Sequence, residues 1–391
     1  MSLSPSGIVR YSGQSGPIFK LAFVTGLLTF ITVGVYRFWA KTRMRNYIWS
    51  SVSIDGDAFE YTGTGLEKLL GFLIAIVFLA IYLVGIQLIL TFLGLGIVMQ
   101  PGNEIAIIAS IYISFFAVVP FLFFAIYRAR RYKLARSRLR GIRFGMDSAA
   151  WGYALRAIGH YLLTALTLGL LLPRQTFYLE KYMTDRSHYG DARFEQGGNW
   201  QGLYPALKHV LIGLAIMVAG GGFSAVLRSP ILAAIAVVLG FCWFMIGFAY
   251  YRVHSYAYLT NHKTLGGQVT FTATPRTGAI IKIMIIGGLA LGLVGAIAFA
   301  MLGGRSYGFA QSGGMGPGVM QALPIVIGYL LILVGLSALG IVMITQPIIA
   351  HLASNLRINN AEALGYIRQR ATDAGADAEG FADALDIGGA I

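Results

Sequence analysis

Long apolar runs are the feature that most restricts how this 391-residue chain folds. Six of them are candidates to cross a bilayer, which takes about 20 apolar residues in a helix. They lie at residues 69–98, 105–126, 206–218, 231–250, 279–302 and 323–349, the third beginning near Leu203. Only 12% of the residues are charged, whereas soluble domains carry about 25%. The pattern predicts a polytopic membrane protein with six full transmembrane helices.

Two weaker apolar segments, residues 18–35 and 151–172, are interrupted by glycine and polar residues. If each crossed once, the second half of the chain would be inverted, as in some transporters. Alternatively, each dips into the membrane and returns. Three links between the spans favour return, because together they hold only two of the 30 Lys and Arg. These links are residues 99–104, 219–230 and 303–322. Cytoplasmic loops concentrate Lys and Arg, so we expect the large basic loops and both termini in the cytoplasm.

Tight-turn signals recur between the apolar segments. They read "SIDGDAF", "LRGIRF", "HYGDARF" and "LGGQVTF", and glycine in such turns accepts positive φ. The pattern predicts an all-α polytopic membrane protein: six transmembrane helices, two short re-entrant or interfacial segments, and small cytoplasmic β-hairpins repeated between the helices. The expected divisions are a first repeat at 1–140, a second at 141–265, a partial third at 266–356, and an acidic cytoplasmic tail at 357–391.

Basic and aromatic residues gather where the chain leaves apolar segments. A helix over residues 36–49 is amphipathic, and residues 127–143 carry eight basic residues and no acid. Interfacial anchoring and topology control are the common roles of such stretches. The functional alternative is binding of a lipid headgroup or an anionic solute. The candidates are Arg37, Trp39, Lys41, Arg43, Arg128, Arg131, Lys133, Arg174 and Arg252.

Arg156 and His160 lie four residues apart within the second weak segment, so they share a helix face. Ionisable residues at membrane depth are costly and indicate function. At the interface that cost disappears, and both side chains simply reach toward water.

The sequence lacks the residue patterns that metal binding, catalysis and nucleotide binding require. The six histidines show no metal-ligand spacing and there is one cysteine, so we expect no metal site and no cofactor. No nucleophile–base constellation or phosphate-binding loop is present, which argues against an enzyme and against ATP coupling. The net charge of +14 has no accompanying nucleic-acid-binding module, so we expect anionic membrane lipids rather than nucleic acid as partners. The pattern sets no oligomeric state.

One stretch resembles a known family. The sequence "LLTFITVGVYRFWAKTRMRNYIW" followed by "FEYTGTGLEKLLGF" resembles the YjgN family of bacterial inner-membrane proteins, and "EGFADALDIG" is similar to that family's C-terminus. Val33 stands where the family usually has leucine. The matching positions are Leu28, Thr29, Thr32, Gly34, Tyr36, Trp39, Ala40, Lys41, Arg43 and residues 61–65. A second copy at 167–182 departs from the pattern at Leu170 and Pro173. The resemblance implies an inner-membrane location and no established activity.

Two functions follow as hypotheses. The first is binding or transport of an anionic or lipidic molecule through basic residues on the cytoplasmic side. The second is a non-transporting scaffold that recruits a protein partner through the hairpins and the acidic tail. That tail reverses the charge balance of the chain, with six acids against Arg368 and Arg370 from residue 360 onward.

Overall fold

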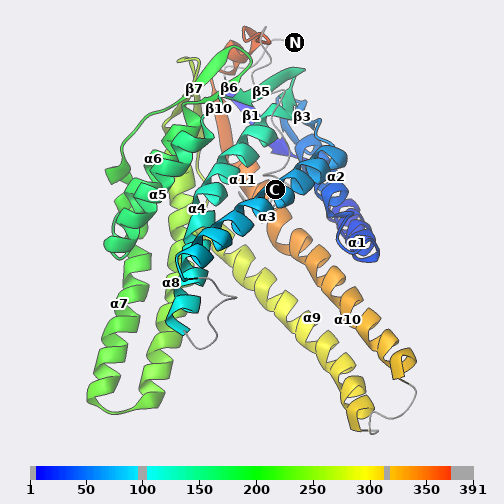
Figure 1. The fold of residues 1–391 in the computed structure, drawn as a ribbon. Coiled ribbons are helices and arrows are strands. Elements are labelled where there is room, and N and C mark those ends of the chain that lie inside the picture. Colours follow the sequence, from blue (N-terminus) through cyan, green and yellow to red (C-terminus); the bar gives the residue numbers. More distant parts are fainter. Residues whose placement is uncertain (1–5, 96–103, 312–317, 371–391) are drawn as a thin grey trace. The chain divides into compact units, whose positions relative to one another are not determined.

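The computed structural model describes residues 6–95, 104–311 and 318–370 (Figure 1). The helices are α1 (Ser15–Ile31), α2 (Arg37–Ser50), α3 (Gly65–Phe92), α4 (Glu104–Ala135), α5 (Ala150–Leu166), α6 (Leu172–Thr184), α7 (Tyr204–Val226), α8 (Pro230–Asn261), α9 (Thr277–Gln311), α10 (Gly318–Gly340) and α11 (Gln346–Ser354). The strands are β1 (Ser6–Tyr11), β2 (Val52–Ile54), β3 (Asp57–Tyr61), β4 (Ser137–Leu139), β5 (Ile142–Met146), β6 (Ser187–Tyr189), β7 (Ala192–Gln196), β8 (Lys263–Leu265), β9 (Val269–Ala273) and β10 (Leu356–Asn359).

The order strand, helix, helix, strand recurs five times along the described chain, counting α10 and α11 with the π-turn between them as one helix. Three of the helical pairs are long. They supply six helices that are long and apolar enough to cross a membrane within the described residues, and these correspond to the six predicted spans. The other two pairs, α1/α2 and α5/α6, contain the two weak segments, and none of their helices exceeds 17 residues.

The strands form a closed antiparallel barrel, so the prediction of an all-α fold with separate hairpins is wrong. Around the barrel the order is β1-β10-β9-β8-β7-β6-β5-β4-β3-β2. The predicted turns do join strand pairs, as in β2–β3 and β4–β5. Successive hairpins also pair with one another, as in β5–β6 and β7–β8. Closure gives every strand two partners. This stabilises the strands, because isolated two-stranded hairpins are marginally stable and their edges are exposed.

Barrel closure depends on residues from the two ends of the described chain. Strand β1 pairs with β10 on one side, with Ser6 opposite Asn359, and with β2 on the other. Alternate residues of β1 differ in burial: Val9 is buried and Ile8 is exposed. This alternation is the two-residue period of a strand with one face toward a core. On β10, Asn359 donates its side-chain amide to Thr270 and Thr272 of β9.

The chain divides into two compact units. Unit 1 consists of Met1–Phe59, Gly202–His262 and Val269–Gly365, and unit 2 of Glu60–Gln201, Lys263–Gln268 and Tyr366–Ile391. In unit 1, α1 packs against α10, although about 300 residues separate them in the sequence. In unit 2, α4 packs against α5, and α5 packs against α6.

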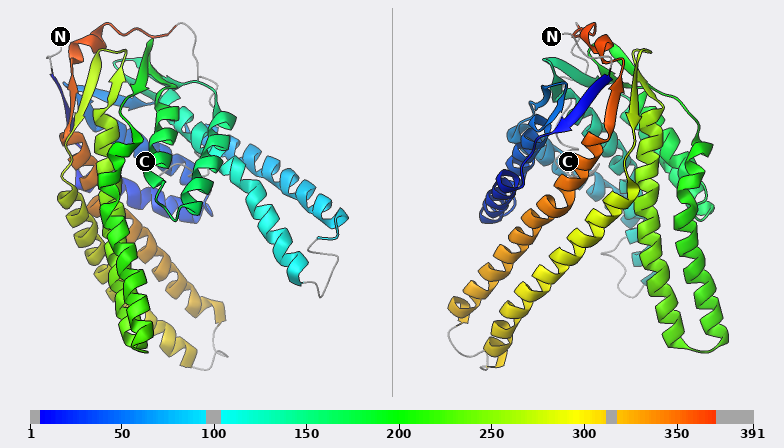
Figure 2. Two further views of the ribbon diagram at one scale, coloured as in Figure 1. Left: turned by 90° about the vertical axis from the view of Figure 1, so that its left-hand side faces the viewer. Right: turned by 180° about the vertical axis from the view of Figure 1, so that it is seen from behind.

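Helices α7 and α8 of unit 1 form a closely packed antiparallel pair (Figure 2). Glycines recur seven residues apart on both helices at the contact, Gly213 and Gly220 on α7 and Gly240 and Gly247 on α8. A Cβ atom placed on Gly247 would lie 2.5 Å from the backbone carbonyl carbon of His209. Small residues permit such close approach between membrane helices. We predicted that the glycines at 220–222 lie in the link between two spans, but they are part of α7.

Unit 2 has an aromatic core formed by residues of α4, β5, α5 and α6. It includes Tyr127, Met146, Tyr153, Leu179 and Tyr182. The Tyr127 hydroxyl donates to the carbonyl oxygen of Asp147 at 2.7 Å, which satisfies its polar atom inside the core.

A C-terminal strap, residues 366–370, crosses the β5–β6 region of unit 2. The Asp191 N–H donates to the Arg368 carbonyl at 2.9 Å, and the Arg368 N–H donates to the Asp191 carboxylate at 3.1 Å. The Gln369 side chain accepts a hydrogen bond from the Arg143 N–H at 2.8 Å. The chain beyond Arg370, which carries most of the predicted acidic tail, lies outside the described residues.

His188 of β6 predicts a pH dependence of stability in this region. It is 5% exposed, and burial together with the positive charge of Arg370 lowers its pKa below the ordinary value of 6.5, with Asp147 opposing and Arg193 assisting. A lowered pKa in the folded state means that the unfolded chain binds the proton more readily. The stabilisation is therefore complete above the ordinary pKa and is lost as pH falls through the folded-state value.

We expect the free energy of unfolding to fall through this histidine as the pH drops below the ordinary histidine pKa. Unfolding of purified protein followed at several pH values measures it. In His188→Gln the decrease should be smaller than in the wild type. An unchanged pH profile in that variant would contradict the assignment.

Candidate functional site

The two short helical pairs turn through the same local structure. In each, a Thr-x-Gly sequence ends the first helix, with positive φ at Val33 and Gly34 (50° and 88°) and at Leu168 and Gly169 (50° and 89°). The Thr167 hydroxyl donates to the Leu163 carbonyl and accepts from the Leu171 N–H. Thr32 makes the equivalent bonds in the first pair. This turn reverses the chain, so α5 and α6 both extend from the same pair of strands, β5 and β6.

The tip of the α5/α6 pair is apolar and exposed. Leu166 is 80% exposed and Leu168 86% exposed, and both follow the exposed Tyr161 and Leu162. The tip of the α1/α2 pair is similar, with Ile31 at 71% and Val33 at 93%. Contiguous exposed apolar surface on a folded protein indicates contact with a partner or with lipid.

Behind that tip, α5 and α6 bring three predicted site residues together in two layers of cations and aromatic rings, here called the α5/α6 collar. In the layer nearer the tip, His160 stacks on Tyr178 with 5.5 Å between ring centroids, and the Arg174 guanidinium lies 5.4 Å from the Tyr178 centroid. In the second layer, Arg156 and Arg186 lie 4.8 Å and 3.6 Å from the Tyr182 centroid. Guanidinium groups within about 6 Å of an aromatic centroid are attracted to the ring face.

The charge of the collar is carried by arginine. Burial lowers the pKa of His160, and the positive charge of Arg174 lowers it further. Neutral His160 therefore accompanies Arg156, Arg174 and Arg186 near neutral pH. Arg174 and Tyr178 lie four residues apart on one helix face, and both are at least partly accessible to solvent. The collar can thus present positive charge and aromatic rings to an anion above an apolar tip.

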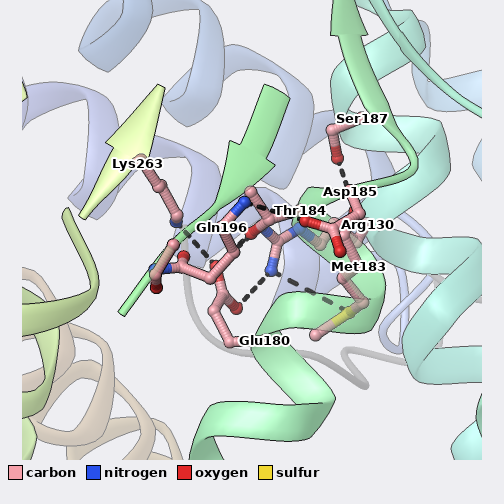
Figure 3. Close-up of polar contacts among 9 residues, drawn as sticks. Arg130, Glu180, Met183, Thr184, Asp185, Ser187, Gln196 and Lys263 are labelled. Atoms are coloured by element: carbon pink, nitrogen blue, oxygen red, sulfur yellow. Dashed lines mark hydrogen bonds and ion pairs between the residues drawn. The ribbon is translucent and has the colours of Figure 1, made fainter. Parts of the chain in front are cut away.

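An ionic network holds the opposite side of α6 (Figure 3). The Glu180 carboxylate accepts hydrogen bonds from the two terminal guanidinium nitrogens of Arg130 on α4, at 2.7 and 3.0 Å. It also accepts one from the Lys263 ammonium on β8 at 2.8 Å. Next to it, Lys181 donates to the Gln196 carbonyl and pairs with Asp185 at 2.9 Å. The bidentate Arg130–Glu180 pair fixes direction as well as distance, so it sets how α6 presents Arg174 and Tyr178.

Burial alone would raise the pKa of Glu180, but Arg130 and Lys263 hold it well below its ordinary value. Glu180 is therefore ionised across the physiological range. None of these three residues was a predicted site residue. They are separated by 50 and 83 positions in the sequence, and the only local signal was a lone acid in the basic, aromatic stretch of α6.

The other predicted site residues lie on α2, α4 and α8. At the start of α2, Tyr36 stacks on Trp39 and Arg43 lies 5.6 Å from the Tyr36 ring centroid, so part of the predicted amphipathic helix forms its own cation–aromatic cluster. Lys41 is half-buried on the same helix. Arg37 lies over the Phe38 ring at 5.9 Å.

On α4, Arg128 lies over Phe124, and Arg131 donates to the Met146 carbonyl, a contact that ties α4 to β5. Lys133 is half-buried on the same helix, and Arg252 is exposed on α8. Within residues 6–95, 104–311 and 318–370, no group of three or more His, Cys, Asp or Glu is arranged to hold a metal ion.

Comparison with known proteins identifies the family. Residues 7–384 match the family described as bacterial proteins of unknown function, DUF898. The chain belongs to the DUF898 family. Two proteins named inner membrane protein YjgN are similar to it: one from Salmonella typhimurium, 27% identical over 146 residues, and one from Escherichia coli O157:H7, 25% identical over 148 residues. The matched regions cover 37% and 38% of this chain and 33% of each relative. No solved structure matches.

The relatives confirm the YjgN resemblance seen in the sequence, although the match spans only about a third of their length. Their names and the six long apolar helices agree that this DUF898 protein is an integral membrane protein. Few residues of those helices are buried; in α3, only 6% of the most apolar 18-residue stretch is buried. Lipid is the solvent that suits such surfaces.

Proposed function

We propose that this protein resides in the bacterial inner membrane and binds anionic phospholipid headgroups at its cytoplasmic side through the α5/α6 collar. The observation that carries the proposal is the order of groups along the pair: an exposed apolar tip, then Arg174, His160 and Tyr178, then Arg156 and Arg186. Membrane-interface segments have this order, with apolar side chains in the acyl region and aromatic and basic side chains at headgroup depth.

Helix length supports partial insertion of this pair. Helix α5 has 17 residues, which is about 26 Å of rise, and α6 has 13. Both are shorter than the about 20 residues that a crossing needs, and the chain reverses between them. The α5/α6 pair and the similar α1/α2 pair would then be re-entrant elements that dip into one leaflet.

Sidedness follows from the same arrangement and is part of the proposal. Every helical pair leaves from one barrel strand and returns to a neighbouring one, so the three long pairs would cross and return and the barrel would stay on one side. The basic residues of α2, α6 and the β4–β5 region belong to that side, and the positive-inside rule makes it cytoplasmic.

The test is retention of lipid by the purified full-length protein in nanodiscs that contain phosphatidylcholine with a minor fraction of phosphatidylglycerol. We expect Arg156→Gln/Arg174→Gln to reduce bound phosphatidylglycerol by roughly thirtyfold, because each basic side chain near an anionic leaflet contributes about 1 kcal/mol and about 1.4 kcal/mol is a factor of ten. A matched control, Arg10→Gln/Arg357→Gln, removes two exposed arginines from β1 and β10. Equal retention by both double variants would sink the proposal.

A second candidate function, recruitment of a protein partner, is supported by the C-terminal strap. Contacts of Arg368 and Gln369 hold the start of the acidic tail on the turn between β6 and β7 and on β5. A partner that bears a basic surface would then bind the acidic residues of the segment 373–391. Deletion of residues 373–391 should abolish co-purification of such a partner and leave lipid retention unchanged. Unchanged co-purification would exclude the adaptor role.

A further inference from the structure

A second group of cations lies in unit 1, on α7 and α8 and at the start of α9. Lys208 and His209 are adjacent on α7, and His254 is on α8. The His209 ring centroid lies 4.5 Å from that of Tyr250, and Tyr250 lies 4.0 Å from His254. The Lys208 ammonium lies 5.6 Å from the Tyr250 ring centroid. One tyrosine ring is therefore flanked by three groups that carry or can acquire positive charge.

The glycine contacts explain why these side chains meet. Gly247 allows the α8 backbone to approach His209 and Val210 of α7. Tyr250 lies one helical turn beyond Gly247, and His254 one turn further, so both follow along the same side of α8. At the far side, the Thr277 hydroxyl lies 3.1 Å from Nδ1 of His254, which links the first residue of α9 to the cluster.

The cluster lacks a negative charge. Within the part of the chain that the structure describes, no carboxylate forms an ion pair or a hydrogen bond with Lys208, His209 or His254. Around the Tyr250 ring, the ionisable groups that accompany His254 are Lys208 and His209. Lys208 is exposed and both histidines are partly accessible. Three like-charged groups gathered around one ring suit an anion that enters from solvent or from the headgroup layer.

We propose that Lys208, His209, Tyr250 and His254 form a binding site for a phosphomonoester, and that binding takes up a proton. A lysine alone matches the single charge of a phosphodiester. The two histidines fit a phosphomonoester better, because its second pKa of about 6 is close to the histidine value of about 6.5. Near neutral pH a small number of protons can therefore be shared between the ligand oxygens and the imidazoles, with each protonated imidazole donating to a phosphate oxygen.

Two sources of this chemistry can be separated experimentally. The lipid source is phosphatidic acid, and the soluble source is inorganic phosphate. Purified full-length protein in phosphatidylcholine nanodiscs receives a minor fraction of phosphatidic acid, or of phosphatidylglycerol as the phosphodiester comparison. Inorganic phosphate is titrated in a third arm. Binding is measured at about pH 6 and about pH 8, on either side of the ordinary histidine pKa.

We expect phosphatidic acid or inorganic phosphate to bind roughly tenfold more tightly at about pH 6 than at about pH 8, the effect of one pKa unit. Phosphatidylglycerol should show no such change. His209→Gln/His254→Gln should remove the pH dependence, and Lys208→Gln should weaken binding at both pH values. Tighter binding of phosphatidic acid or inorganic phosphate than of the phosphodiester supports the site, and the two arms report which source the protein uses.

Control variants distinguish loss of the binding site from a general effect on the structure. His262→Gln alters an exposed histidine at the end of α8, and Lys282→Gln an exposed lysine on α9. Both should behave as wild type. Arg156→Gln/Arg174→Gln in unit 2 should bind less phosphatidylglycerol, as expected for the collar, and should keep the wild-type pH dependence of binding to phosphatidic acid or inorganic phosphate. If the double histidine variant does not fold, His254→Asn and Lys208→Gln are measured singly. Equal, pH-independent binding of phosphatidic acid and phosphatidylglycerol, or an unaltered pH response in the histidine variants, overturns the proposal.

Discussion

Glu180→Leu is expected to lower the free energy of unfolding by roughly 3 kcal/mol, because it leaves Arg130 and Lys263 without the carboxylate that pairs with both. Removal of one partner of a buried ion pair costs about 3–5 kcal/mol, and the lower end applies because 21% of the Glu180 side chain is exposed. Denaturation in detergent, followed through tryptophan fluorescence, measures the change.

A triple variant tells pairing from packing. In Arg130→Met/Glu180→Leu/Lys263→Met no charge is left unpaired, and replacement of buried ion pairs by apolar residues of similar volume is often nearly neutral. We expect this protein to recover most of the stability lost in the single variant. By contrast Lys181→Ala, which breaks the more exposed Lys181–Asp185 pair, should cost less than about 1 kcal/mol. A triple variant no more stable than the single one would show that the network contributes through shape alone.

The same network should make the free energy of unfolding decrease at acidic pH. The pKa of Glu180 is lowered in the folded protein, so its contribution is present above the ordinary glutamate pKa and is lost as pH falls through the folded-state value. This acid-dependent loss should be absent in Glu180→Leu. It is separate from the loss expected through His188, which begins near the ordinary histidine pKa.

Gly247→Ala is expected to destabilise the protein by roughly 2–3 kcal/mol, in the upper range for overpacking. The added Cβ would lie 2.5 Å from the His209 carbonyl carbon and 2.6 Å from the Val210 nitrogen. These are backbone atoms of α7, so relief requires α7 and α8 to separate. The yield of folded protein and its thermal midpoint report the loss, and the pH dependence of phosphate binding should weaken with them.

The matched control is Gly221→Ala, on α7 itself, where an added Cβ meets nothing within 4 Å. Alanine in a helix is usually more stable than glycine by roughly 0.5–1 kcal/mol, so this variant should be unchanged or slightly stabilised. Opposite signs at the two glycines are the expected result. Equal effects would mean that α7 and α8 do not pack as closely as the glycine contacts indicate.

The membrane helices were predictable from the sequence and the barrel was not. Apolar length is a local property, so the segments at 69–98 and 231–250 are visible in isolation. Turn chemistry is also local: Asp55 and Gly56 have the positive φ that an Asp-Gly turn requires. Strand partners are a long-range property. Nothing near Ser6 indicates that Asn359 will lie opposite it, and three-residue strands such as β4 are too short to show a periodic pattern.

The same distinction applies to the candidate site. Arg156 and His160 were identifiable because a helix repeats every 3.6 residues and they lie in an apolar context. Arg174 was identifiable because residues 167–182 are similar to the basic and aromatic stretch that begins near Thr32. Glu180 was not identifiable, because its role depends on partners from α4 and β8. The closeness of His209 to Tyr250 likewise depends on how two helices pack, which the sequence indicates only through its glycines.

Pairing of β1 with β10 makes the order of elements cyclic rather than linear. The first and last strands are neighbours, so residues 6 and 365 can be joined by a short linker and new termini opened elsewhere, for example at the α7–α8 turn. Circular permutation tolerates new ends at exposed loops. Each strand–helix–helix–strand segment is then one sector of a ring, in which every strand has two neighbours.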